Sequence, residues 1–334
     1  MREKMIMGGI SVVAAILIAI TLVDVFTGID NGIESESGTS NESYNMVENG
    51  QTGSSNGGEN GTDAGDNQSG NNKDDNSDHK KNEAIINPDG MTLMTRINTP
   101  SGYMRTEVTD GSLGEFVRNY QVKEDGAKVL IYDGTEKENQ DAHVAVFALP
   151  LEARDLQHCA DSVMRMYAEY YLSTNQYEKI GFHLTDGFYA DYAKWREGNR
   201  IVFSDSGSYW SKKKDYNDSY EIFQEYMRIV FAYAGSYSMK SECEAIEPSE
   251  IQIGDVFIYG GSPGHVAMIV DVCEDADGNK AFLLAQGFMP AQEFHILKNP
   301  NHEDDPWYYI DEIKYPFVTP EYTFKEGSLM RPEY

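Results

Sequence analysis

The stretch that decides the fold is Ile253-Gly-Asp-Val-Phe-Ile-Tyr-Gly-Gly-Ser-Pro-Gly-His-Val-Ala-Met-Ile-Val-Asp271. Two runs of Val, Ile, Phe and Met flank a loop of Gly, Ser and Pro, a pattern typical of two strands joined by a turn. His265 opens the second run. A histidine at this place has its ring held by a rigid sheet while one edge can face a cleft, so His265 is a candidate catalytic base.

Other short apolar runs extend the strand pattern in both directions. Residues 281–286 and 293–297 follow the quoted stretch, after a turn at Asp275-Ala-Asp-Gly-Asn279, and residues 128–132 and 143–147 precede it. Their length and apolar content are those of strands. We therefore expect consecutive antiparallel strands in the carboxyl-terminal part of the chain.

Helical periodicity dominates the region before the quoted stretch. Asp155 is suited to cap a helix that runs to about residue 172, and a second helix begins at Asp218 or Ser219, with Gly235 at its C-cap. Helices followed by an antiparallel β meander indicate an α+β domain.

An apolar segment lies close to the amino terminus. Residues 5–23 are almost wholly apolar or small, Arg2 and Lys4 flank them, and acidic residues follow. A helix of this length rises about 28 Å and can cross a hydrocarbon core of about 30 Å. The charge distribution keeps the amino terminus cytoplasmic and sends the rest of the chain outside. A cleaved signal peptide shares the charged start and the apolar middle, and it is the alternative.

These patterns divide the chain into three parts. Residues 1–27 are predicted to be a membrane anchor, and residues 28–82 a disordered acidic linker rich in Gly, Asn and Ser. Residues 83–334 are predicted to form one α+β domain, whose tail after residue 299 wraps the surface. We expect a single-pass cell-membrane protein with an extracytoplasmic carboxyl-terminal domain.

Composition limits the partners and cofactors. The formal net charge of −28 disfavours nucleic acid as a partner. Cys159, Cys243 and Cys273 are an odd number without metal-type spacing, so one disulfide is possible but no disulfide framework is present. The sequence contains no histidine pair at metal-binding spacing on a helix and no phosphate-binding loop. We expect neither a metal nor a cofactor.

The Gly254-Asp255 and Gly264-His265 strand pair resembles that of the NlpC-type and CHAP-type cell-wall peptidases. The resemblance implies a papain-like core, in which the histidine is the general base for a cysteine at a helix amino terminus. A third polar residue on the next strand orients the histidine ring. Here His265 would be the base, and Gln286 would be the orienting residue because its carbonyl can accept from the far ring nitrogen.

Two residues are candidates for the nucleophile. Ser219 begins the helix before the Gly-Asp strand, where the resembling families have their cysteine, but it is alternatively a simple N-cap. Cys159 lies in the first turn of the earlier helix, where the helix dipole favours a thiolate. Alternatively, Cys159 is a small core residue. The sequence leaves the choice open.

A second resemblance covers most of the folded part. The motifs that carry it are Asp155-Leu-Gln-His-Cys-Ala-Asp161, Phe231-Ala-Tyr-Ala-Gly-Ser236, Gly254-Asp-Val-Phe-Ile258, Pro263-Gly-His-Val266, Leu284-Ala-Gln-Gly-Phe-Met-Pro-Ala-Gln292 and Thr319-Pro-Glu-Tyr-Thr-Phe324. Their order resembles a bacterial extracytoplasmic domain family of unknown function. This resemblance implies an envelope protein and assigns no activity.

Two functional hypotheses follow. The first is a cell-envelope hydrolase or transferase that acts on amide bonds of peptidoglycan or a related substrate, with His265, Gln286 and either Cys159 or Ser219 as its catalytic residues. The second is a non-catalytic module of the same fold that binds a cell-wall component or an envelope protein. The two differ in whether a nucleophile lies within reach of His265.

Overall fold

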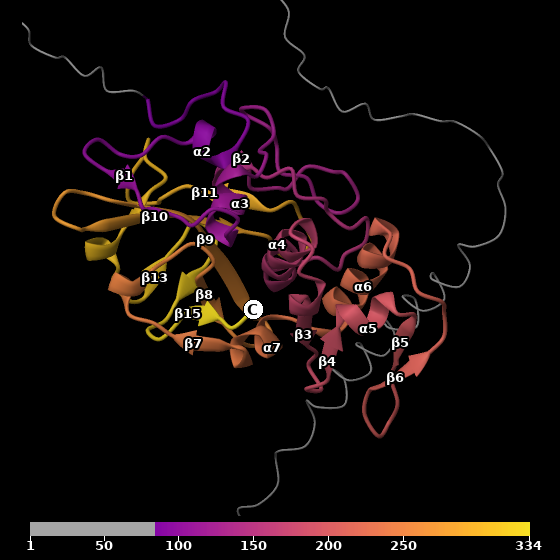
Figure 1. Cartoon of the computed structure of the whole chain (residues 1–334). Coiled ribbons are helices and arrows are strands. Elements are labelled where there is room, and N and C mark those ends of the chain that lie inside the picture. The colour runs from indigo at the N-terminus through magenta and orange to yellow at the C-terminus, as the bar shows by residue number, and fades with distance from the viewer. Residues whose placement is uncertain (1–83) are drawn as a thin grey trace, which may run out of the picture. The chain divides into compact units, whose positions relative to one another are not determined.

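One antiparallel sheet organises the computed structural model, which describes residues 84–334 (Figure 1). Its strands are β1 (Met104–Arg105), β2 (His143–Val146), β7 (Cys243–Ala245), β8 (Val256–Tyr259), β9 (His265–Glu274), β10 (Lys280–Gln286), β11 (His295–Leu297), β12 (Tyr308–Tyr309) and β15 (Leu329–Pro332). The main order is β2-β11-β10-β9-β8-β15-β7, while β1 pairs with β9 and β12 with β10. The predicted anchor and linker lie outside the described residues.

The remaining elements are helices and short strand pairs. The α-helices are α2 (Leu93–Arg96), α3 (Leu113–Asn119), α4 (Cys159–Ser173), α5 (Tyr192–Arg196), α6 (Tyr220–Tyr233) and α7 (Ser236–Ser241). The 3-10 helices are η1 (Tyr177–Lys179), η2 (Pro248–Glu250) and η3 (Ile310–Glu312). The two-stranded pairs are β3 (Gly181–His183) with β4 (Tyr189–Asp191), β5 (Asn199–Val202) with β6 (Tyr209–Lys212), and β13 (Phe317–Val318) with β14 (Thr323–Phe324). Helices and antiparallel strands together confirm the α+β class. None of the helices in this part of the chain is long and apolar enough to span a bilayer.

The meander β8-β9-β10-β11 matches the predicted consecutive strands. Its register sets Tyr259 of β8 opposite His265 of β9, and Gln286 at the end of β10 opposite His295 of β11. Because β9 begins and β10 ends at the same edge of the antiparallel pair, His265 and Gln286 are brought side by side.

Both faces of the central strands are buried, which explains their nearly continuous apolar runs. Along β9, Val266 and Met268 belong to the core cluster that includes the helices, whereas Ala267 and Ile269 belong to a second cluster with the carboxyl-terminal segment. This alternation is the two-residue period of a strand. The sheet therefore lies between a helical layer and the carboxyl-terminal segment.

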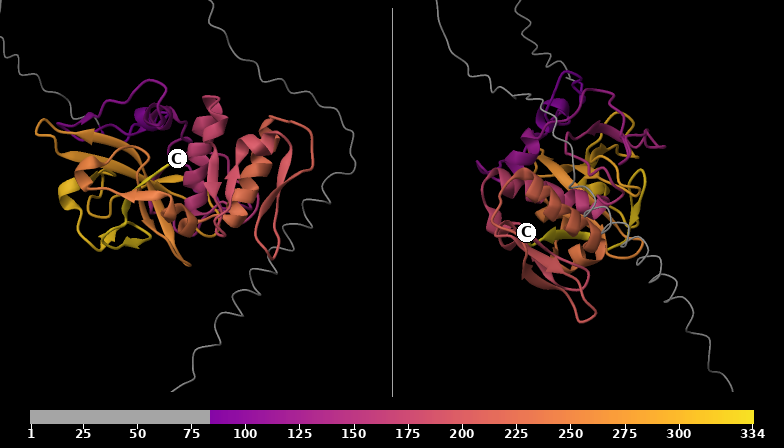
Figure 2. Two further views of the ribbon diagram at one scale, coloured as in Figure 1. Left: turned by 60° about the horizontal axis from the view of Figure 1, so that its bottom comes forward. Right: turned by 90° about the vertical axis from the view of Figure 1, so that its right-hand side faces the viewer.

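The helical layer begins with α4, which packs directly on β9. Helix α6 packs on α4 and α5, so α4 lies between the sheet and α6 (Figures 1 and 2). Val163, Tyr167 and Tyr170 of α4 are buried at helical spacing, as the sequence predicts. The helix ends at Ser173 with Thr174 as its C-cap, and Asn175 has a φ of 57°, in the left-handed region that often follows a helix.

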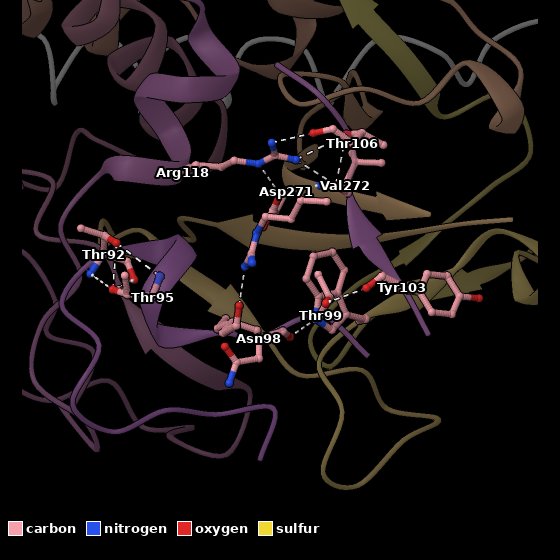
Figure 3. Close-up of polar contacts among 12 residues, drawn as sticks. Thr92, Thr95, Asn98, Thr99, Tyr103, Thr106, Arg118, Asp271 and Val272 are labelled. Atoms are coloured by element: carbon pink, nitrogen blue, oxygen red, sulfur yellow. Dashed lines mark hydrogen bonds and ion pairs between the residues drawn. The ribbon is translucent and has the colours of Figure 1, made fainter. Parts of the chain in front are cut away.

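A buried ion cluster ties the amino-terminal segment to β9. The Asp271 carboxylate is fully buried and accepts from Nε of Arg118 and from Nε of Arg105, each at 2.7 Å. Arg118 also donates to the carbonyls of Thr106 and Val272 (Figure 3). A carboxylate without these partners would be costly to bury, so the arrangement fixes α3 against the strand.

The start of α4 differs from the prediction. The N-cap is His158 rather than Asp155, and the helix begins at Cys159. The Asp155 side chain makes other contacts instead: its Oδ1 accepts from the backbone N–H of Ala291 at 2.7 Å and lies 3.0 Å from Nε2 of His158. The later start makes Cys159 the first residue of the helix.

Two other predictions need correction. Residues 128–132 form no strand, because Leu130 and Ile131 make only isolated bridges to Glu136 and Gln292. The tail after residue 299 does not simply wrap the surface, because β12 and β15 join the main sheet. Such short strands are recognisable only from their distant partners, which local sequence does not contain.

Candidate functional site

His265 is the first residue of β9, and its side chain is held by hydrogen bonding and by aromatic packing. Its Nε2 lies 2.7 Å from Oε1 of Gln286, the last residue of β10. The ring centroids of Tyr322 and Phe288 lie 4.6 and 4.8 Å from the imidazole centroid. His265 is only 2 % exposed, so its ring is held within the sheet and offers almost no surface to solvent, whereas the sequence predicts that one edge faces a cleft.

Burial sets the charge state of this histidine. Removal from water lowers the pKa of His265 to about 4, although the hydrogen bond to Gln286 and the nearby Glu321 carboxylate favour the protonated form. The imidazole is therefore neutral at pH 7. With Nε2 donating to the Gln286 carbonyl, Nδ1 carries the lone pair.

Cys159 is the first residue of α4 and lies at the amino end of β9. The backbone N–H of Val266, the residue after His265, is near enough to favour the thiolate form of Cys159. Burial is the main reason that the pKa of the thiol is raised to about 11, and the Asp161 carboxylate adds to the rise. The backbone N–H groups of Val266, Ala160 and Cys159 act in the opposite direction, because they stabilise a thiolate.

A glycine permits the close approach of α4 to the end of β10. A Cβ atom on Gly287 would lie 2.5 Å from Oγ of Ser162 and 2.9 Å from the carbonyl oxygen of His158. These distances are shorter than any real carbon contact. Because Gly287 directly follows Gln286, this contact brings the first turn of α4 to the strand end that carries the predicted orienting residue.

The structure therefore places His265 against Gln286 and packs α4, which begins with Cys159, on the strand that begins with His265, whereas Ser219 begins a different helix. Ser219 is the N-cap residue of α6, and its backbone N–H is bonded to Asn217. Helix α6 lies on the side of α4 that is remote from β9 (Figure 1). Of the two nucleophile candidates, Cys159 is the one beside the histidine strand.

Glu321 is a component of this site that the sequence analysis does not single out. Nε2 of Gln286 donates to Oε2 of Glu321 at 2.8 Å, and Nζ of Lys137 lies 2.5 Å from the same oxygen. Burial alone would raise the pKa of Glu321, but His295 and Lys137 outweigh it and lower the pKa to about 2. The signal available in the sequence was the motif Thr319–Phe324, which contains Glu321.

Asp255, the acidic residue of the quoted stretch, has a structural role. Its buried carboxylate accepts from Nε of Arg331 at 2.7 Å and from the backbone N–H of Gln252 at 2.8 Å. These bonds tie β8 to β15. Gly254 before it has a φ of +104°, and a Cβ there would lie 2.5 Å from the hydroxyl oxygen of Tyr167. The Gly-Asp pair thus serves the packing of the sheet.

The other two cysteines lie away from Cys159 and His265. Cys243 is in β7 and donates to the carbonyl of Met239, and Cys273 is buried in β9, where it pairs in register with Ala281. All three cysteines are free thiols. Within residues 84–334, no cluster of three or more His, Cys, Asp or Glu side chains is placed to hold a metal ion.

A comparison with protein-family models matches residues 93–331 to the family described as Domain of unknown function (4846). The chain belongs to this family. The matched residues include Cys159, His265, Gln286 and Glu321, and the match confirms the predicted membership of a domain family of unknown function. Searches of curated proteins and of solved structures gave no significant match.

Proposed function

We propose that this domain is a cysteine-dependent amide hydrolase or acyltransferase with a papain-like catalytic core. The observation that supports it best is that Cys159 begins α4, the helix that packs on β9, and that β9 begins with His265. Gln286 holds the far nitrogen of the same imidazole at 2.7 Å. A thiol at a helix start, a histidine and an orienting amide are the groups that this chemistry needs.

The reaction proceeds in two steps with these groups. Nδ1 of His265 takes the thiol proton, and the sulfur of Cys159 attacks the amide carbonyl carbon. The C–N bond breaks as the imidazolium protonates the leaving amine, and a thioester remains. In the second step His265 deprotonates water, which attacks the thioester and releases the acid and the thiol. An amine in place of water gives transfer instead of hydrolysis.

The amino terminus of α4 supplies stabilisation for the negative charge that develops. The backbone N–H groups in the first turn of a helix have no partners within the helix, and they carry the positive end of its dipole. Cys159 is the first residue of that turn, so a thiolate or an oxyanion formed there faces these donors. Within residues 84–334, no hydrogen bond joins Ser219 to a histidine.

We propose an amide bond of peptidoglycan or of a related envelope polymer as the substrate, outside the cytoplasmic membrane. The support for this location is the sequence pattern of residues 5–23 and the acidic linker. The support for the substrate is the resemblance of the Gly-Asp and Gly-His strand pair to cell-wall peptidases.

A non-catalytic binding module is the second candidate, and one observation favours it. The ring of Tyr322 lies against His265, with centroids 4.6 Å apart, so the base is covered by the carboxyl-terminal segment. Such a cover suits a site that no longer turns over substrate. Turnover measurements separate the two functions.

The experiment is turnover of peptidoglycan and of peptide amides by the full-length chain. We expect Cys159→Ala and His265→Ala each to lower kcat by about a thousandfold or more, because the two groups act as a unit. Ser219→Ala and Cys243→Ala are the matched controls and should keep full activity. Turnover that survives in Cys159→Ala would contradict the proposed cysteine-dependent enzyme. The absence of turnover by the unsubstituted protein would contradict it as well.

A further inference from the structure

A chain of buried polar groups continues from His265 to a cation. Gln286 is fully buried, and its amide nitrogen donates to Glu321 at 2.8 Å. Lys137 pairs with the same carboxylate oxygen at 2.5 Å, and the side chains of Lys137 and Glu321 are only 7 % and 12 % exposed. Burying two charges costs free energy that well-packed apolar side chains would not. Their position directly behind the imidazole suggests what this arrangement does.

We propose that Glu321, held by Lys137, is a positioning residue that determines which nitrogen of His265 acts as the base. A carboxylate can only accept hydrogen bonds, so it compels Gln286 to turn its NH₂ group toward Glu321. The carbonyl of Gln286 then faces His265, and Nε2 must carry the ring proton. Nδ1 is left with the lone pair. The catalytic importance of this effect rests on the proposed function, whereas the tautomer itself does not.

The opposite amide orientation would block the reaction. The two ends of a glutamine amide are nearly the same in shape, so without a fixed acceptor the group can turn over. Its NH₂ would then donate to Nε2 of His265, and the proton of the neutral ring would move to Nδ1. An imidazole in that tautomer has no lone pair at Nδ1 to take the thiol proton of Cys159.

The surroundings of Glu321 keep it an acceptor. Oε1 accepts from Nδ2 of Asn139 at 3.1 Å, while Nε2 of His295 lies 3.8 Å from Oε2, beyond hydrogen-bond distance. His295 is itself buried, which lowers its pKa, and its Nδ1 lies 2.8 Å from the carbonyl of Glu293. Of the two groups that lower the pKa of Glu321, Lys137 is the one that pairs directly with its carboxylate, at 2.5 Å.

The test reads the tautomer directly. The full chain is prepared with isotope-labelled histidine, and NMR reports which ring nitrogen of His265 carries the proton, with His265→Gln used to assign its signals. We expect the Nε2-protonated form in the unsubstituted protein. In Glu321→Gln that form should fall to about half of the molecules, because a neutral amide accepts and donates equally well. Asn139→Ala, which removes a contact from the same carboxylate without touching Gln286, should leave the tautomer unchanged.

A second variant keeps the carboxylate and removes its partner. In Lys137→Met the buried Glu321 loses its compensating charge, so its pKa should rise and the tautomer of His265 should become pH-dependent. Raising the pH should restore the Nε2-protonated form. An unchanged tautomer in both variants would overturn the proposal. The expected tautomer shifts in a protein that turns over no amide would support the positioning role and reject the enzyme.

Discussion

At the scale of single residues, the central fact is that Cys159 and His265 are both neutral at rest. Burial raises the pKa of the thiol to about 11 and lowers that of the imidazole to about 4, so an ion pair is disfavoured. In a cysteine enzyme of this type the charges would separate only when a substrate occupies the site. The same setting protects the thiol from adventitious reagents.

Alkylation of Cys159 by iodoacetamide tests this state. With a thiol pKa of about 11, roughly one molecule in ten thousand carries a thiolate at pH 7. The rate should therefore rise about tenfold per pH unit between pH 7 and 10, as followed by mass spectrometry of the peptide that contains Cys159. Free cysteine measured in parallel should level off near its own pKa of about 8.5. A Cys159 rate that levels off near pH 7 would contradict the neutral pair.

At the scale of elements, the site depends on how closely the amino terminus of α4 approaches the end of β10. Two segments that are distant in sequence contribute the residues of this site: α4 carries Cys159, and the consecutive strands β9 and β10 carry His265 and Gln286. Among the described residues, no disulfide joins them. The approach is maintained by packing and by hydrogen bonds such as that from the backbone N–H of Ala291 to Asp155. Gly287 is the position where added volume would separate the two elements most directly.

Gly287→Ala tests that approach. The new methyl group would meet Ser162 Oγ at 2.5 Å and the His158 carbonyl at 2.9 Å, so α4 must shift. We expect a loss of about 1 to 3 kcal/mol in the free energy of unfolding, measured by urea denaturation. The matched control is Gly235→Ala, because a Cβ there has no heavy atom within 4 Å. Equal stability of the two variants would show that the contact is not close in solution.

At the scale of the whole molecule, buried titratable groups couple stability to pH in both directions. His265 has a lowered pKa, so the unfolded chain binds its proton more readily and acid favours unfolding. Asp161 and Asp255 have pKa values raised by burial, so their contribution to stability improves as the pH falls. The measured dependence of stability on pH is the sum of these contributions. The contribution of a single group can therefore be found only by comparing variants.

The comparison that isolates His265 is between the unsubstituted protein and His265→Gln. The pKa of His265 falls from 6.5 to about 4 on folding, so its contribution to stability is present above pH 6.5 and is lost as the pH falls toward 4. This loss amounts to about 3 kcal/mol. Between pH 7 and 4, His265→Gln should lose about that much less than the unsubstituted protein, as measured by chemical denaturation. Parallel profiles for the two proteins would contradict a depressed pKa.

Local patterns predicted much of this architecture, and long-range contacts account for the rest. The strands from Val256 to Leu297 were recognisable because they are consecutive and strongly apolar. The sequence could not show which of Cys159 and Ser219 lies near the strand of His265. Both begin helices, and only tertiary packing decides which helix meets β9. Glu321 lies 35 residues from Gln286, and its contact with that amide has no local signature.

The position of β15 has a consequence for the timing of folding. Residues 329–332 fill the gap between β7 and β8, and the register joins Met330 both to Ala245 and to Val256. Until this segment has left the ribosome, β8 and β7 each present an unpaired edge that invites association with other chains. The sheet therefore closes only after residues 329–332 have been synthesised, and until then these two edges of the nascent domain need shielding.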